Sequence, residues 1–138
     1  MMTLLRLLRN QGDPLAVSIA GIKMGDRLLV AGCADPRLVA RLAVKTGLTG
    51  RAMAVDARPA LVERVAALAP KEGALVETAV TPWQALPAAD GSFDVAVVHD
   101  VFATLTAPER AACAAEIHRI LRPGGRCLVI DRTRAAGL

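Results

Sequence analysis

The segment that decides the fold reads Arg27-Leu28-Leu29-Val30-Ala31-Gly32-Cys33-Ala34-Asp35-Pro36. Its first half is a short apolar run, typical of a strand that is covered on both faces of a parallel sheet. Gly32 then allows the backbone to turn sharply. Asp35 is placed to cap a helix that begins at Pro36, where a missing N–H costs nothing. The segment therefore predicts a strand, a glycine turn and a helix in succession.

The residues that follow complete a β-α-β unit. The expected helix ends near Gly47 and carries one apolar stripe, made of Leu38, Val39, Leu42 and Ala43. A second apolar strand, Met53-Ala54-Val55-Asp56, ends in a carboxylate. A glycine turn with such a distal acid is the layout that holds a nucleoside by its ribose hydroxyls. Asp56 is equally well placed to cap the loop before Pro59.

The composition indicates one globular domain. The chain has 138 residues, of which 54% are hydrophobic and 22% charged, and this excludes a disordered chain. Aromatic residues make up only 2%, which argues against a base-stacking surface, so we expect no nucleic-acid partner. The net charge is +4, with a local excess of arginine near the C-terminus. A solvated surface explains that excess, and a contact with phosphates or acidic lipid is the alternative.

The three cysteines are an odd number without C-x-x-C spacing: Cys33, Cys113 and Cys127. This pattern argues against a disulfide framework and against a metal site, and it favours a reducing cytoplasm. Cys33, beside the turn, is interpreted as a small core residue and not as a nucleophile. No run approaches the ~20 apolar residues that span a bilayer, so we expect no membrane span.

Residues 1–25 predict a helical lid ahead of the first strand. Leu4, Leu5 and Leu8 share one helical face, and Gly12 breaks that run. A second helix begins at Asp13-Pro14, with an apolar stripe made of Leu15, Ile19 and Ile22. Two interpretations are open, a lid that packs on the sheet and a flap over a ligand pocket.

The rest of the chain continues the alternation of strands and helices. We expect a helix from Pro59, strands over 74–77, 93–98 and 126–131, and a helix opened by the capping box of Thr106 and Glu109. Residues 26–138 are thus the core of a single domain, 1–138, with an open parallel five-stranded sheet covered on both faces. The ligand crevice should lie at the carboxyl ends of the first and fourth strands, near Gly32, Asp56 and His99–Asp100.

With these motifs in place, the chain resembles the class I S-adenosylmethionine-dependent methyltransferases over nearly all its length. Residues 28–35 are similar to the family's first motif, and Ala54-Val55-Asp56 to the second-strand acid that binds the cofactor ribose. Ser92-Phe93-Asp94 and residues 116–125 resemble the approaches to its fourth and fifth strands. The resemblance implies a Rossmann-like three-layer sandwich, sheet order 3-2-1-4-5 and S-adenosylmethionine as cofactor. The implied cofactor-binding residues are Gly32, Cys33, Ala34, Asp35, Asp56, Ala57, Pro82, Trp83 and His99.

Several residues depart from the family pattern. Val30 stands where the first motif has an acid, and Ala34 and Pro36 replace its second and third glycines. A Cβ at Ala34 obstructs the close approach that glycine allows. Pro82 stands where many relatives have an acid near the adenine. The usual C-terminal β-hairpin is also lacking.

Methyl transfer is an in-line displacement that needs alignment more than a covalent enzyme group. A base is required only when the acceptor must lose a proton, and His99 and Asp100 are the candidate catalytic residues. A hydrogen-bonded structural histidine is the alternative for His99. Asp35 at a helix N-terminus disfavours a pyrophosphate there, which argues against the runner-up, a nicotinamide-binding fragment.

The fifth strand would have an unpaired apolar edge, which predicts a homodimer or a partner subunit that covers it. Two functions stay open. One is a methyltransferase with a degenerate cofactor loop that acts on an unknown acceptor. The other is a catalytically inactive methyltransferase-fold module for binding or assembly.

Overall fold

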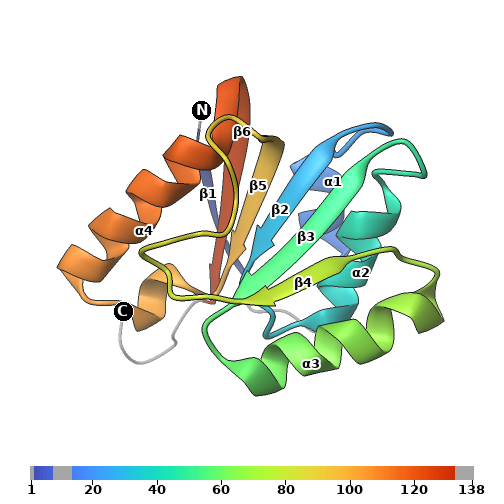
Figure 1. Cartoon of the computed structure of the whole chain (residues 1–138), viewed down its shortest axis with the longest axis horizontal. Helices are drawn as coiled ribbons and strands as arrows, with labels where there is room; N and C mark the ends of the chain where they lie inside the picture. The colour runs from blue at the N-terminus through green and yellow to red at the C-terminus, as the bar shows by residue number, and fades with distance from the viewer. Residues whose placement is uncertain (1, 8–13, 133–138) are drawn as a thin grey trace.

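The computed structural model of the chain describes residues 2–7 and 14–132, and it is an α/β fold in three layers (Figure 1). The strands are β1 (Met2–Leu7), β2 (Arg27–Ala31), β3 (Arg51–Asp56), β4 (Glu77–Val80), β5 (Phe93–His99) and β6 (Leu121–Arg132). The helices are α1 (Pro14–Ala20), α2 (Pro36–Val44), α3 (Pro59–Leu68) and α4 (Ala107–Ile120). Two short 3₁₀ turns, η1 (Ala69–Glu72) and η2 (Phe102–Thr104), complete the set of described elements.

All the strands are parallel, in the order β1-β6-β5-β2-β3-β4. The five strands expected from the sequence are β2 to β6, and their order confirms the predicted 3-2-1-4-5 arrangement. Their carboxyl ends converge on one rim of the sheet, where the arrowheads meet in Figure 1. The switch in strand order lies between β2 and β5, as the predicted ligand crevice requires.

The first strand, β1, corrects two predictions. Residues 2–7 were expected to be helical, yet they form a strand that pairs with β6 from Met2↔Cys127 to Leu7↔Arg132. A short apolar run does not distinguish helix from strand by periodicity, and the open N–H and C=O groups of β6 favour a strand beside them. The predicted unpaired edge on the fifth strand is therefore wrong, because β1 covers it. The homodimer itself stays a prediction, and Leu8, Gly12 and Asp13 lie outside the described residues.

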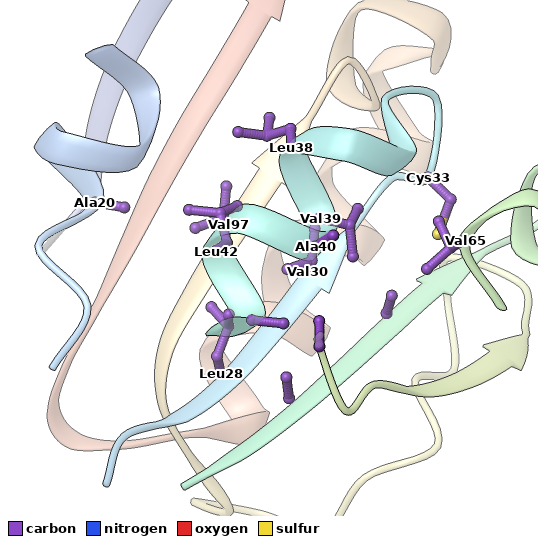
Figure 2. Packing of buried hydrophobic residues seen from close by; sticks show 14 of the residues in the cluster. Ala20, Leu28, Val30, Cys33, Leu38, Val39, Ala40, Leu42, Val65 and Val97 are labelled. Atoms are coloured by element: carbon purple, nitrogen blue, oxygen red, sulfur yellow. The ribbon is translucent and has the colours of Figure 1, made fainter. Parts of the chain in front are cut away.

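One face of the sheet packs against α1, α2 and α3. In Figure 2, Leu38, Val39 and Leu42 of α2 lie over β2 and β5. The predicted α2 stripe is confirmed, since its members Leu38, Val39, Leu42 and Ala43 are all buried. This packing fixes the start of α2, and therefore also the turn that joins it to β2.

The α1 helix packs on its neighbours through small residues. Its buried residues are Ala16 and Ala20, whereas Leu15 and Ile19 are 46% and 42% exposed. The predicted inward stripe of Leu15 and Ile19 is therefore wrong. Alanine lets a helix backbone approach its neighbours closely, so packing distance decides which face turns inward here. The burial of Ala16 and Ala20 in the core favours the first interpretation of this segment, a lid that packs on the sheet.

The opposite face is covered by α4 and by residues 81–88. Thr106 and Glu109 form the predicted capping box at the start of α4. Cys113, Ile117 and Ile120 of this helix are buried against the sheet. No helix among the described residues is long and apolar enough to cross a membrane.

Two strand boundaries differ from the prediction. The third expected strand begins only at Glu77, because η1 ends at left-handed Gly73 and the N–H of Ala74 turns back to the carbonyl of Ala69. β6 already starts at Leu121, with a register irregularity opposite Phe93 and Val95. Pro123, Gly124 and Gly125, which precede the strand expected over 126–131, thus form an irregularity inside a longer strand.

The arginine excess near the C-terminus has internal partners where the structure describes it. Arg119 bonds to Glu116 and Asp90, and Arg122 bonds to Asp94. Arg126 donates to the backbone carbonyls of Ala20 and Gly21. These guanidinium groups hold loops to the amino-end rim of the sheet.

Candidate functional site

The carboxyl-end rim is joined by backbone hydrogen bonds that run across the sheet. The N–H of Gly32 donates to the carbonyl of Val55 at 2.9 Å, and the N–H of Thr81 donates to the carbonyl of Asp56 at 3.0 Å. On the other side, the N–H of Asp100 donates to Ile130 at 2.8 Å. The loops after β2, β3, β4 and β5 therefore meet at one place, as the sequence predicts.

Gly32 lies just after β2, against the end of β5. Its φ is +109°, and a Cβ built on it would collide with the carbonyl oxygen of His99. Only glycine fits this approach. The turn after β2 is thus pressed against the end of β5, at the predicted switch point.

Asp35 is the N-cap of α2, as predicted. Its Oδ1 accepts the N–H of Leu38 at 3.0 Å, and Pro36 occupies the first helical turn. The carboxylate also places a negative charge at the positive end of the helix. Asp35 therefore fixes the direction of α2 as it leaves the glycine turn.

Asp56 is the most enclosed charge at the rim, with no solvent exposure. Its Oδ2 accepts the N–H of Cys33 at 2.8 Å, which fixes the end of β3 against the turn after β2. Its Oδ1 accepts the N–H of Arg58 at 2.9 Å. The Arg58 guanidinium bonds both oxygens, with Nε to Oδ1 at 2.9 Å and Nη2 to Oδ2 at 3.0 Å.

These contacts decide the charge of Asp56. Burial raises its pKa, but hydrogen bonds from the guanidinium of Arg58 and from two backbone N–H groups more than offset this, and the pKa lies below its ordinary value. The pKa of Arg58 is raised in return, chiefly by its hydrogen bond to Asp56. Asp56 is therefore ionised at neutral pH.

Arg58 was missed by the sequence analysis. It lies two residues beyond a strand-end acid and just before a helix that begins at Pro59. That spacing allows a side chain to fold back on the acid, which is the signal that could have identified it.

The thiol of Cys33 is not a nucleophile here. Burial is the main cause that raises its pKa to about 12, and the charge of Asp56 adds to the effect. The nucleophilic form of a cysteine is the thiolate, and it is absent at neutral pH at such a pKa. Cys33 serves the site through its backbone N–H, as the interpretation of a small core residue implies.

His99 and Asp100 lie side by side at the end of β5. Nε2 of His99 is 3.7 Å from Oδ2 of Asp100, and the two side chains are 12% and 17% exposed. Nδ1 of His99 is buried and has no hydrogen-bond partner in the described part of the chain. Asp100 has a left-handed backbone, with φ of +54°. The pair therefore lies at the rim, and the imidazole nitrogen without a partner is enclosed by protein.

The remaining predicted cofactor residues are placed differently from one another. Trp83 packs into the core with Leu29 and Val55, so its ring is buried and is not exposed for a ligand to stack on. Pro82 and Ala57 are exposed, and Ala34 is half-buried in the turn. No three His, Cys, Asp or Glu side chains of residues 2–7 and 14–132 gather as metal ligands.

Comparison with known proteins identifies the family of this chain. Residues 29–129 match the model of the methyltransferase domain. An uncharacterized protein of Mycobacterium tuberculosis is 36% identical over 122 residues, which cover 87% of this chain and 42% of that protein. The ubiquinone/menaquinone biosynthesis C-methyltransferase UbiE of Hydrogenovibrio crunogenus is 27% identical over 118 residues, 84% of this chain and 46% of the enzyme.

A solved structure shares the fold. The crystal structure of a SAM-dependent methyltransferase from Aquifex aeolicus superposes with a TM-score of 0.77 at 21% identity, covering 92% of this chain and 73% of that one. The chain spans less than half the length of the curated relatives it matches. The family match and the shared sheet order together show that the chain belongs to the class I S-adenosylmethionine-dependent methyltransferase domain family.

Proposed function

We propose that this chain binds S-adenosylmethionine at the carboxyl-end rim and transfers its methyl group to an acceptor. One observation carries the proposal: the N–H of Cys33 holds the Asp56 carboxylate at 2.8 Å, beside the glycine turn after β2. This is the position in which the family resemblance expects the ribose-binding acid. A strand-end carboxylate next to a glycine turn is the arrangement that holds a ribose.

The residues of the rim fit such a ligand. Asp56 is ionised, and it can accept the hydroxyls of a ribose where one of its present N–H donors leaves. The turn at Gly32 brings the backbone of the loop after β2 directly against the end of β5. Asp35 puts a negative charge at the start of α2, which suits a cationic sulfonium and disfavours a pyrophosphate. Bound S-adenosylmethionine would supply an electrophilic methyl group on its sulfonium.

His99 and Asp100 are the proposed groups for moving a proton. The imidazole of His99 and the neighbouring carboxylate of Asp100 lie side by side at the end of β5, and either group can accept a proton from an acceptor that reaches the rim. An acceptor that is already a nucleophile needs only alignment with the methyl group. The role of this pair therefore depends on the acceptor.

The first test is a calorimetric titration with S-adenosylmethionine and S-adenosylhomocysteine. We expect the wild-type chain to bind both ligands and Asp56→Ala to bind neither, because the ribose hydroxyls lose their acceptor. Glu63→Ala, at an exposed position on α3, removes a carboxylate away from the rim and should bind as the wild type does. Equal binding by wild type and Asp56→Ala would contradict the proposed site.

The contacts of Asp56 also support a second candidate function. Its two oxygens already hold four N–H donors from the chain itself, as they would in a module that needs no cofactor. The alternative is a catalytically inactive methyltransferase-fold module for binding or assembly. The absence of any heat at millimolar ligand would favour this module over the enzyme.

A further inference from the structure

We propose that Arg58 is an internal competitor for the cofactor site, whose guanidinium occupies Asp56 until a vicinal diol displaces it. The inference deepens the proposed function and rests on it. It assigns to Arg58 a role in setting both the affinity and the selectivity of the ribose site.

The argument begins with the acceptor capacity of Asp56. An ionised carboxylate has about four lone-pair sites. In this chain Oδ1 accepts the backbone N–H and Nε of Arg58, and Oδ2 accepts the N–H of Cys33 and Nη2 of Arg58. Every acceptor position is therefore in use, and a ligand hydroxyl can bond only where one of these donors leaves.

The donors differ in how easily they can leave. The N–H groups of Cys33 and Arg58 belong to the backbone of the glycine turn and of the loop after β3, and they hold the carboxylate in place. The guanidinium stands at the end of a flexible side chain that is 50% exposed, whereas the side chain of Asp56 is fully buried. The guanidinium is therefore the pair of donors that can move into solvent.

The exchange is one for one. The guanidinium gives Asp56 two N–H donors, and the 2′- and 3′-hydroxyls of a ribose give two O–H donors. Asp56 keeps four hydrogen bonds before and after the exchange. The displaced guanidinium also keeps an anionic neighbour, since the charge of Asp100 acts on Arg58 in the same sense as that of Asp56. A ligand with one hydroxyl would leave an acceptor site of a buried carboxylate unfilled, so the exchange selects for a diol.

Removal of the guanidinium should therefore strengthen ligand binding. We compare S-adenosylhomocysteine binding by calorimetry for the wild type, Arg58→Met, Arg58→Lys and the control Arg64→Met, which removes an exposed positive charge on α3. Arg58→Met should bind about tenfold tighter, the order expected for a bidentate ion pair that is partly exposed. Arg58→Lys should be intermediate, because an ammonium lacks the bidentate fork. Arg64→Met should match the wild type.

Two conditions separate competition from a structural role. The titrations are run at pH 8, because loss of the guanidinium leaves burial to raise the pKa of Asp56. Higher ionic strength should tighten binding by the wild type, since salt weakens the competing ion pair, and should leave Arg58→Met unchanged. Circular dichroism checks that each variant is folded. If Arg58→Met does not fold, Arg58→Lys, which keeps a cation beside Asp56, provides the test in its place.

The outcomes distinguish this inference from the proposed function. If the wild type binds and neither Arg58 variant binds more tightly, the competitor role is wrong and the cofactor site stands. If no variant binds at millimolar ligand, the proposed function fails and the inference fails with it. Binding by Arg58→Met alone would support both, with Arg58 as the group that keeps the site closed.

Discussion

At the scale of single residues, the site depends on a backbone approach that tolerates no side chain. Gly32 combines a left-handed φ with direct contact to the carbonyl of His99. Gly73 also has a left-handed φ, of +75°, but nothing lies within 4 Å of where its Cβ would be. A side chain at Gly73 would therefore cost only backbone strain, whereas a side chain at Gly32 would cost backbone strain and a steric collision.

We expect Gly32→Ala to destabilise the fold by about 3 kcal/mol or more, and Gly73→Ala by only about 1 kcal/mol. The difference is the cost of moving the ends of β2 and β5 apart. Urea denaturation of both variants measures it. Similar losses in the two variants would mean that the contact between Gly32 and His99 is not tight.

The sequence predicts the residues of the rim better than it predicts their partners. Asp35, Asp56 and His99 lie at the carboxyl ends of parallel strands, because strand ends follow from apolar runs and turn residues. The partnership of Asp56 with Arg58 is not predicted, because it depends on the rotamer of a long side chain. The burial of Trp83 likewise depends on the path of a loop that has no periodic pattern.

At the scale of elements, strongly patterned segments match their predictions and short ones do not. α2 begins at the predicted cap and buries the predicted stripe, and α4 begins at its capping box. The predictions for β1 and for the inward face of α1 are wrong, because a run of six or seven residues is too short for its hydrophobic period to distinguish a helix from a strand or to identify the buried face. Their structure is decided by neighbours distant in the sequence, β6 for the strand and the sheet face for the helix.

We expect Thr106→Ala to lower the free energy of unfolding by about 1 kcal/mol, because it removes the side-chain half of the capping box on α4. Thermal denaturation followed by circular dichroism gives the change. Glu109→Ala removes only the reciprocal bond to the N–H of Thr106 and serves as the matched comparison. An unchanged melting temperature in Thr106→Ala would show that the cap does not stabilise this helix.

At the scale of the whole molecule, a charge cluster joins the strands at the amino-end rim. Asp94 of β5 accepts the backbone N–H and the guanidinium of Arg27, at the start of β2. It also accepts the guanidinium of Arg122, at the start of β6. One carboxylate therefore holds three strands together at the end opposite to the site.

This cluster predicts a loss of stability in acid. The hydrogen bonds from Arg27, and then those from Arg122, hold the pKa of Asp94 well below its usual range. A carboxyl group whose pKa is depressed in the folded state stabilises the fold above the unfolded pKa of about 4 and loses this contribution as the pH falls further. Denaturation of the wild type and Asp94→Asn at pH 7 and pH 3 should give a large difference in stability at pH 7 and a smaller one at pH 3. A difference that does not change with pH would contradict this account.

The place of β1 at the sheet edge has a consequence for how the molecule folds. β1 pairs with β6, so Met2 and its partner Cys127 stand 125 positions apart in the sequence (127 − 2). Loop closure of that size is slow, and the segments between them form their contacts sooner. During synthesis β1 therefore stays unpaired until β6 has been made, and we expect the pairing of β1 with β6 to be among the last contacts of this domain to form.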